Sequence, residues 1–302
     1  MSQRLQLLQV GRLARRTLDE STGLVVSFIE SLADPHGGYV NRGGRPDLYY
    51  TSFALDALVA LDALPTEGPR ADRTRAFLDG FGGGERLDLV HRCCLVRAWA
   101  AQPPSALPAD RRETLLAGVA AHRTADGGYA SRSGADRGTA YGCFLAVNAR
   151  ADLRSPVPET GPEADALAGC VAGLRARDGG FANAPDQPEG STTATAAAVS
   201  VLRSLGRPVP AGVAEWILAR RHPAGGFTAA PDAPIPDLLS TAVALHALDA
   251  LEAPWRQWRE GMLDFIDSLW TAEGAFHGSW ADDEPDAEYT FYGLVALGHA
   301  SV

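Results

Sequence analysis

Two kinds of helical segment alternate along this chain, one apolar on nearly all sides and one apolar on a single face. Residues 51–61 are of the first kind, because apolar side chains cover almost the whole circumference. A helix that is apolar all round is a buried helix. Residues 69–80 are of the second kind, since charged residues at positions 70, 72, 73 and 75 stand among apolar residues at positions 71 and 76–78. The pattern therefore predicts buried inner helices and amphipathic outer helices.

The alternation continues to the end of the chain. Inner helices are predicted near residues 51–61, 90–101, 139–147, 192–205, 241–251 and 289–299. Outer helices are predicted near residues 69–80, 109–122, 163–176, 211–221 and 255–270. Residues 5–33 also have helical periodicity, and Asp34-Pro35 ends that helix. The pattern thus gives six pairs of helices.

Glycine-rich turns separate the pairs at a regular interval. Gly-Gly-aromatic sequences occupy residues 37–39, 127–129, 179–181 and 225–227, with weaker copies at 82–84 and 274–276. After each turn an acidic residue precedes a Thr, Arg or Ala by four places, in the pairs Asp47 and Thr51, Asp88 and Arg92, Asp136 and Ala140, Glu189 and Thr193, Asp237 and Thr241, and Asp286 and Thr290. Such self-similarity is typical of repeat architectures. We expect the first five of these acids to cap helices, accepting amides of the first turn.

Six helical hairpins form either an open superhelix or a closed ring. An open superhelix needs polar caps at both ends, but the last inner segment, residues 289–297, is as apolar as a middle one. We therefore predict an all-α fold, an α/α toroid in which six inner and six outer helices close into a ring. Residues 1–302 would form a single domain, with the acidic segments around the mouth of a central cavity.

Charge and composition narrow the range of partners. A net charge of −10 and a pI near 5.2 disfavour nucleic acid and anionic membranes. No apolar run is long enough to span a membrane, and residues 1–16 lack the apolar stretch of a signal peptide, which favours a cytoplasmic protein. The four cysteines suggest neither a disulfide framework nor a zinc site of the CxxC type.

The Arg-flanked Asp-Gly-Gly-aromatic turns at residues 122–129 and 174–181 resemble the repeat shared by protein prenyltransferase β subunits and squalene/terpene cyclases. The resemblance covers residues 34–300 and is more specific for fold than for activity. It implies a polyprenyl or other hydrophobic small-molecule substrate in the cavity of the ring. A partner subunit is neither required nor excluded by it.

The resemblance also implies where a metal would lie. In prenyltransferases one acidic segment reads Asp-x-Cys and a later one supplies a His, and together they bind zinc. Here the residues at the third place of the six segments are Tyr49, Val90, Gly138, Ser191, Leu239 and Glu288, and the fourth places contain a single His, His91. Because an Asp and a lone His are a poor ligand set for zinc, we expect no metal and no other cofactor.

In class II cyclases the same segment reads Asp-x-Asp-Asp-Thr-Ala, and its middle Asp protonates an alkene or epoxide. Residues 189–194 keep the Thr-Ala but lack both inner carboxylates, whereas the sixth segment has Glu288 at the third place, close to Asp286. Glu288 is therefore the candidate general acid, with Asp286 beside it, and its pKa would have to be raised by an apolar site or a neighbouring carboxylate. The favoured function is a proton-initiated terpene cyclase. For Glu288 the alternative is a solvated or ion-paired side chain. The alternative functions are a prenyl-group transferase, and a non-catalytic toroid that binds a lipid or a protein.

Aromatic and histidine side chains on the inner helices are candidates for substrate binding. Aromatic faces stabilise a nearby cation by about 0.5–2 kcal/mol, which suits a carbocation, although the same residues would equally form an aromatic core. The candidates are Tyr49, Tyr50, Phe53, His91, Trp99, Tyr141, His246, Phe291 and Tyr292. For His91 and His246 the alternative is a hydrogen-bonded core histidine.

Overall fold

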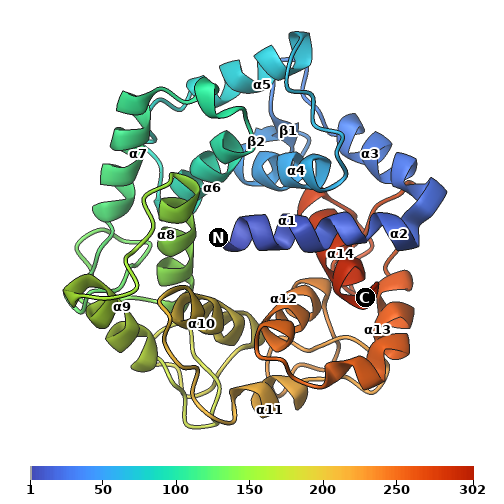
Figure 1. The fold of residues 1–302 in the computed structure, drawn as a ribbon. Helices are drawn as coiled ribbons and strands as arrows, with labels where there is room; N and C mark the ends of the chain where they lie inside the picture. The colour runs from blue at the N-terminus through green and yellow to red at the C-terminus, as the bar shows by residue number, and fades with distance from the viewer. Residues whose placement is uncertain (1) are drawn as a thin grey trace.

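The computed structural model describes residues 2–302 and has two concentric layers of helices around one axis (Figure 1). The inner layer comprises α4 (Leu48–Ala60), α6 (Leu89–Ala100), α8 (Ala140–Asp152), α10 (Thr192–Ser204), α12 (Leu238–Ala250) and α14 (Ala287–Ala300). Each inner helix contacts the next one along the chain, and α14 contacts α4. The predicted all-α closed toroid is confirmed.

The outer layer comprises α3 (Thr22–Ser31), α5 (Pro69–Asp79), α7 (Ala109–Ala120), α9 (Pro162–Ala172), α11 (Val213–Leu218) and α13 (Arg259–Asp267). These helices bury one face only; α5, for example, buries Ala71, Thr74 and Leu78. Short 3₁₀ helices occupy η1 (Asp19–Ser21), η2 (Pro104–Ala106) and η3 (Trp255–Trp258), so the predicted helix over 255–270 is divided. The antiparallel pair β1 (Tyr39–Val40) and β2 (Pro46–Asp47) is the one sheet within residues 2–302.

The prediction of one helix over residues 5–33 is wrong. The segment contains α1 (Gln3–Leu13), α2 (Arg15–Leu18), η1 and α3, and the chain turns at Asp19, whose φ is 45°. Figure 1 shows α1 lying across the inside of the ring, where it contacts α4, α8 and α14. Gly298 permits this packing, since a Cβ there would lie 2.0 Å from the carbonyl oxygen of Val10. As Gly298 lies near the end of α14, α1 covers the mouth formed by the C-terminal ends of the inner helices.

The Gly-Gly-aromatic turns connect each repeat to its neighbour. Gly225 has a φ of 94°, and a Cβ there would lie 2.0 Å from the carbonyl oxygen of Gly261 on the next outer helix. In the last unit Gly274 approaches Leu24 of α3 in the same way, with a Cβ 2.5 Å from its backbone. Only glycine combines this backbone conformation with so close an approach. The turns therefore join the last unit to the first.

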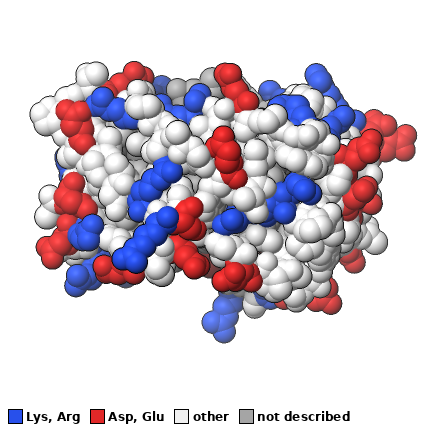
Figure 2. Space-filling view, turned by 90° about the horizontal axis from the view of Figure 1, so that it is seen from below, with Lys and Arg blue, Asp and Glu red and all other residues white. Residues whose placement is uncertain are grey.

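The outside of the ring has mixed charge. In Figure 2 arginine and acidic side chains are interspersed over the visible face. The sequence contains 27 arginines and no lysine. No helix within residues 2–302 has the length and apolar character needed to cross a membrane.

Candidate functional site

The N-caps of the inner helices determine which side chains reach the centre of the ring. Asp47, Asp88, Asp237 and Asp286 each accept a hydrogen bond from an amide of the first turn, as expected for the first three. Such caps stabilise a helix by roughly 1 kcal/mol.

The predictions that Asp136 and Glu189 cap helices are wrong. Thr139 caps α8 and Ser191 caps α10, each accepting from an amide of its helix. Asp136 and Glu189 stand three and two residues before these caps, in exposed loops. The register of the third and fourth segments therefore differs from the one predicted.

In the observed register, the residue two places after each cap occupies the third place of its segment. These residues are Tyr49, Val90, Tyr141, Thr193, Leu239 and Glu288, so Gly138 and Ser191 are replaced in the predicted set. All of them except Val90 line one cavity. The third place is thus the position in the first turn of an inner helix whose side chain reaches the cavity.

The cavity has a volume of about 400 Å³, within the range of roughly 300–1,000 Å³ typical of small-molecule sites. Much of its wall is apolar, with Leu145, Ala196 and Val243 contributed by three inner helices. Helix α1 adds Gln3, Arg4 and Leu7. Because α1 covers the C-terminal mouth, these residues form the inner end of the cavity.

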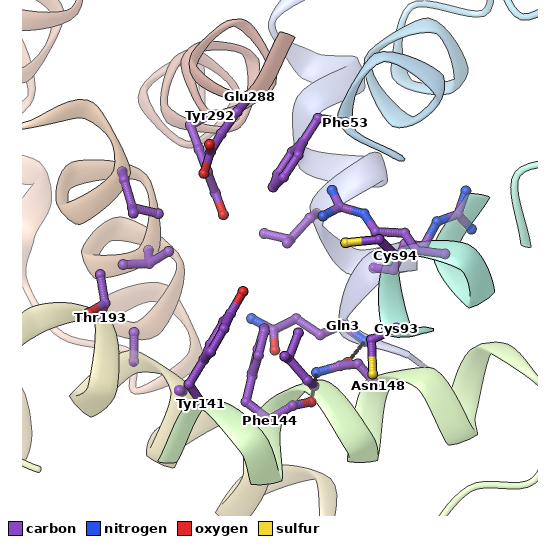
Figure 3. Close-up of a pocket in the computed structure, with 18 of the residues that line it drawn as sticks. Gln3, Phe53, Cys93, Cys94, Tyr141, Phe144, Asn148, Thr193, Glu288 and Tyr292 are labelled. Carbon is purple, nitrogen blue, oxygen red and sulfur yellow. Dashed lines mark hydrogen bonds between the residues drawn. The ribbon is translucent and has the colours of Figure 1, made fainter. Parts of the chain in front are cut away.

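Glu288 faces this cavity from the first turn of α14 (Figure 3). The hydroxyl of Tyr49 donates a hydrogen bond to its Oε1 at 2.6 Å. Burial raises the pKa of Glu288 and the charge of Asp286 adds to the effect, whereas the Tyr49 hydrogen bond and Arg97 oppose it. No hydrogen bond to Oε2 is made within residues 2–302. That oxygen is therefore free to hold the proton of the neutral acid.

Asp286 is engaged elsewhere. Its Oδ1 accepts the amide of Tyr289 at 2.8 Å, and its Oδ2 pairs with Nε of Arg42 at 2.8 Å. Burial raises its pKa, but the side chain does not line the cavity. Asp286 therefore influences Glu288 through its charge and does not face a ligand directly.

Aromatic rings flank the carboxyl on two sides. The centroid of Phe53 lies 5.0 Å from that of Tyr49 and 5.5 Å from that of Tyr292. Across the cavity Tyr141 stacks on Phe144, with an interplanar angle of 15°. Figure 3 shows the phenols of Tyr141 and Tyr292 pointing into the cavity from opposite walls. Phe291 also lines the site but is fully buried.

Four predicted substrate-binding residues lie outside this cavity: Tyr50, His91, Trp99 and His246. His91 is half-exposed and pairs through Nδ1 with Asp88 at 2.8 Å. Trp99 is buried near the end of α6.

His246 belongs to a partly buried hydrogen-bonded chain. Its Nδ1 lies 3.2 Å from Nε2 of His299, whose Nδ1 lies 2.6 Å from Asp249. Burial, with a smaller effect from the neighbouring His299, lowers the pKa of His246 to about 3. The structure therefore places it as a neutral core histidine.

Sequence reasoning missed several polar residues that line the cavity: Gln3, Arg4, Cys93, Cys94, Arg97, Asn148, Asp152 and Asn183. One signal was present. Asp56 and Arg97 are each flanked by apolar residues in the sequence, at positions 53–61 and 93–100, and a charge buried in a helix needs a partner. Across residues 2–302, no three His, Cys, Asp or Glu side chains are grouped so that they could hold a metal ion.

Comparisons with known proteins agree with the fold. The family model of the prenyltransferase alpha-alpha toroid domain matches residues 2–146, 130–210 and 209–300. None of the curated proteins compared with the chain matches it in sequence.

Solved structures with the same fold include a transferase and a cyclase. Protein geranylgeranyltransferase-I of Candida albicans, complexed with GGPP, has a TM-score of 0.69 at 12% identity over 91% of this chain and 90% of that chain. The type II terpene cyclase MstE from Scytonema has a TM-score of 0.62 at 13% identity, over 95% of this chain and 98% of that chain. A variant of MstE in complex with its substrate geranylgeranyl dihydroxybenzoate has a TM-score of 0.64 at 12% identity, with the same coverage. At this identity the likeness is one of fold.

Proposed function

The chain belongs to the prenyltransferase α/α-toroid family, and from that premise we propose that it converts an isoprenoid, with Glu288 as the acid that starts the reaction. The apolar cavity supports an isoprenoid substrate. So does the handling of geranylgeranyl compounds by two proteins of the same fold. The reaction class is a proton-initiated cyclisation like that of class II terpene cyclases.

The position of Glu288 is the observation that carries this proposal. In the observed register, residues 191–196 (STTATA) align with the cyclase motif Asp-x-Asp-Asp-Thr-Ala, which puts Thr193 at the place of the middle Asp. Glu288 occupies the equivalent place in the sixth unit and faces the same cavity. The fourth unit therefore lacks the acid, and the sixth unit supplies one at the equivalent place.

The chemistry needs the neutral carboxyl, and burial favours that form because it raises the pKa of Glu288. Proton transfer from Glu288 to an alkene carbon forms a C–H bond and leaves the neighbouring carbon cationic. A second double bond of the same chain then attacks that cation, and loss of a proton gives an isomer of unchanged mass. Tyr49 stabilises the carboxylate left on Glu288, since its hydroxyl already donates to Oε1.

The aromatic walls differ in what they offer a carbocation. The guanidinium carbon of Arg97 lies 4.3 Å from the ring centroid of Phe53 and 5.0 Å from that of Phe291. These two rings are already engaged with a cation. Within the part of the chain that the structure describes, the guanidinium of Arg97 lies over those two rings and no guanidinium lies over the ring of Tyr141 or Tyr292. We therefore assign stabilisation of the cation to this second pair.

The test is incubation with geranyl-, farnesyl- and geranylgeranyl-containing substrates, with products analysed by mass. We expect an isomer of unchanged mass and no adduct, with turnover unaffected by a metal chelator. Glu288→Gln should lower turnover by about 10²–10⁴-fold, the usual contribution of a general acid, with substrate affinity nearly intact. The exposed Glu284→Gln serves as the control. Parent activity in Glu288→Gln would exclude this mechanism, and a zinc-dependent adduct would indicate a transferase.

A further inference from the structure

Two arginines share one carboxylate in the wall of the cavity. Asp56 of α4 is fully buried, and its Oδ1 accepts Nε of Arg4 at 2.8 Å, with Nη2 at 2.7 Å. Its Oδ2 accepts Nε of Arg97 from α6. Both carboxylate oxygens are therefore used.

The charges of this cluster do not balance. Arg4 and Arg97 contribute two positive charges against the one negative charge of Asp56. Two further carboxyls line the cavity, Asp152 and Glu288, and burial raises the pKa of each, so that their neutral forms persist to a higher pH than in water. A buried ionic group without a full counter-charge is costly. An anion bound in the cavity would remove this excess.

Arg97 has the donors for such an anion. Arg4 is fully engaged, because its Nη1 also donates to the carbonyl oxygen of Ala100 at 3.3 Å. Arg97 uses Nε on Asp56, and within residues 2–302 its two terminal nitrogens donate no hydrogen bond. The rings of Phe53 and Phe291 lie against the guanidinium and restrict its orientation. The side chain lines the cavity and keeps 22% of its surface exposed.

We propose that Arg97 binds a carboxylate carried by the ligand, so that the substrate is an isoprenoid acid or a prenylated acid. A planar carboxylate matches a guanidinium fork through two parallel hydrogen bonds. The excess of one positive charge suits this monoanion better than a diphosphate, which has more charge than one free fork neutralises. The isoprenoid part of the ligand rests on the proposed function, whereas the acid group rests on the cluster alone.

The test compares farnesoic acid with its uncharged methyl ester by calorimetric titration of the wild-type protein. We expect the acid to bind about 10- to 100-fold more tightly, the effect of a charge-assisted hydrogen bond. Arg97→Met should abolish this preference. Arg150→Met is the matched control, because Arg150 pairs with Glu163 and does not line the cavity. Equal affinity of the wild type for acid and ester, or a preference that survives in Arg97→Met, would overturn the proposal.

Two further variants separate the possible failures. Arg97→Lys keeps the charge beside Asp56 but loses the fork, so it should fold and retain only part of the preference for the acid. Glu288→Gln should retain the preference for the acid, because Glu288 makes no hydrogen bond to Arg4, Asp56 or Arg97 and the substitution adds no negative charge near Arg97. Parent turnover in Glu288→Gln together with a wild-type preference for the acid would exclude the general acid and leave the acid site standing. Loss of turnover in Glu288→Gln together with equal wild-type affinity for acid and ester would exclude the acid site and leave the general acid standing.

Discussion

At the scale of the residue, Glu288 is subject to opposing influences on its pKa. Burial and the charge of Asp286 favour the neutral acid, while Tyr49, Arg97 and Arg42 favour the carboxylate. The resulting pKa is raised, so the neutral form persists to a higher pH than in a solvated glutamate. Activity that needs the protonated acid should accordingly fall as the pH rises through this value.

Replacing Tyr49 tests this balance. Tyr49→Phe removes the hydrogen bond that lowers the pKa of Glu288. The pKa should then rise further, and the descending limb of the pH–rate profile should move to higher pH. Tyr50→Phe is the control, since Tyr50 stands beside it in the chain but does not line the cavity. A limb that stays in place in Tyr49→Phe would mean that another group controls the profile.

The sequence was sufficient to predict that Glu288 faces the cavity, because the motif gives its place within one repeat. It was not sufficient for Arg97, whose significance depends on Asp56 from a neighbouring helix and on Arg4 from α1. Such a cluster joins three segments that no local pattern relates. His246 shows the same limit, since its partner His299 lies 53 residues away.

At the scale of the element, the turns of the fourth and fifth units are fastened to the inner helix that follows. The amide of Phe227 donates to Oγ1 of Thr241 at 2.9 Å, and the amide of Phe181 donates to Thr195 at 2.9 Å. The Thr of the repeat is therefore part of the fold and not of the cavity. This explains why Thr195, and not Thr193, is the equivalent residue in the fourth unit.

Removing one such hydroxyl should destabilise the ring. Thr241→Val keeps the shape of the side chain but leaves the buried amide of Phe227 without its acceptor, which costs about 1–3 kcal/mol. Thr193→Val is the matched control, because Thr193 faces the cavity and accepts from no turn. Its stability should change by less than about 0.5 kcal/mol. Urea unfolding measures both, and equal midpoints for the two variants would contradict this role.

The elements were predictable because buried and amphipathic helices differ over their whole length. The acidic residues gave the wrong cap position in the third and fourth units, although the sequence contained a better signal. Ten residues separate Phe227 from Asp237 and Phe276 from Asp286, and the same separation joins Tyr129 to Thr139 and Phe181 to Ser191. Thr and Ser cap helices as Asp does. Spacing from the aromatic residue was therefore more informative than charge.

At the scale of the whole molecule, α1 gives the ring one closed end. Local periodicity could not show this, because an amphipathic helix packs equally well outside a ring or across it. The arrangement depends on distant contacts, such as Gly11 beside Ala60 and the hydrogen bond from the amide of Gln3 to Asn148 at 3.2 Å. By closing one end, α1 sets the depth of the cavity and therefore the length of chain that it accepts.

Shortening a side chain on α1 should consequently change the preference for ligand length. Leu7 lines the cavity, whereas Leu5 on the same helix is 46% exposed. Leu7→Ala removes three carbon atoms from the inner end, and each additional methylene of ligand buried there is worth about 0.8 kcal/mol. We expect Leu7→Ala to shift relative affinity several-fold from farnesol toward geranylgeraniol, while Leu5→Ala leaves the ratio unchanged. Titration of both alcohols with each variant measures the shift. An unchanged ratio in Leu7→Ala would show that chain length is set at another wall, since a closed end formed by α1 must respond to the size of this residue.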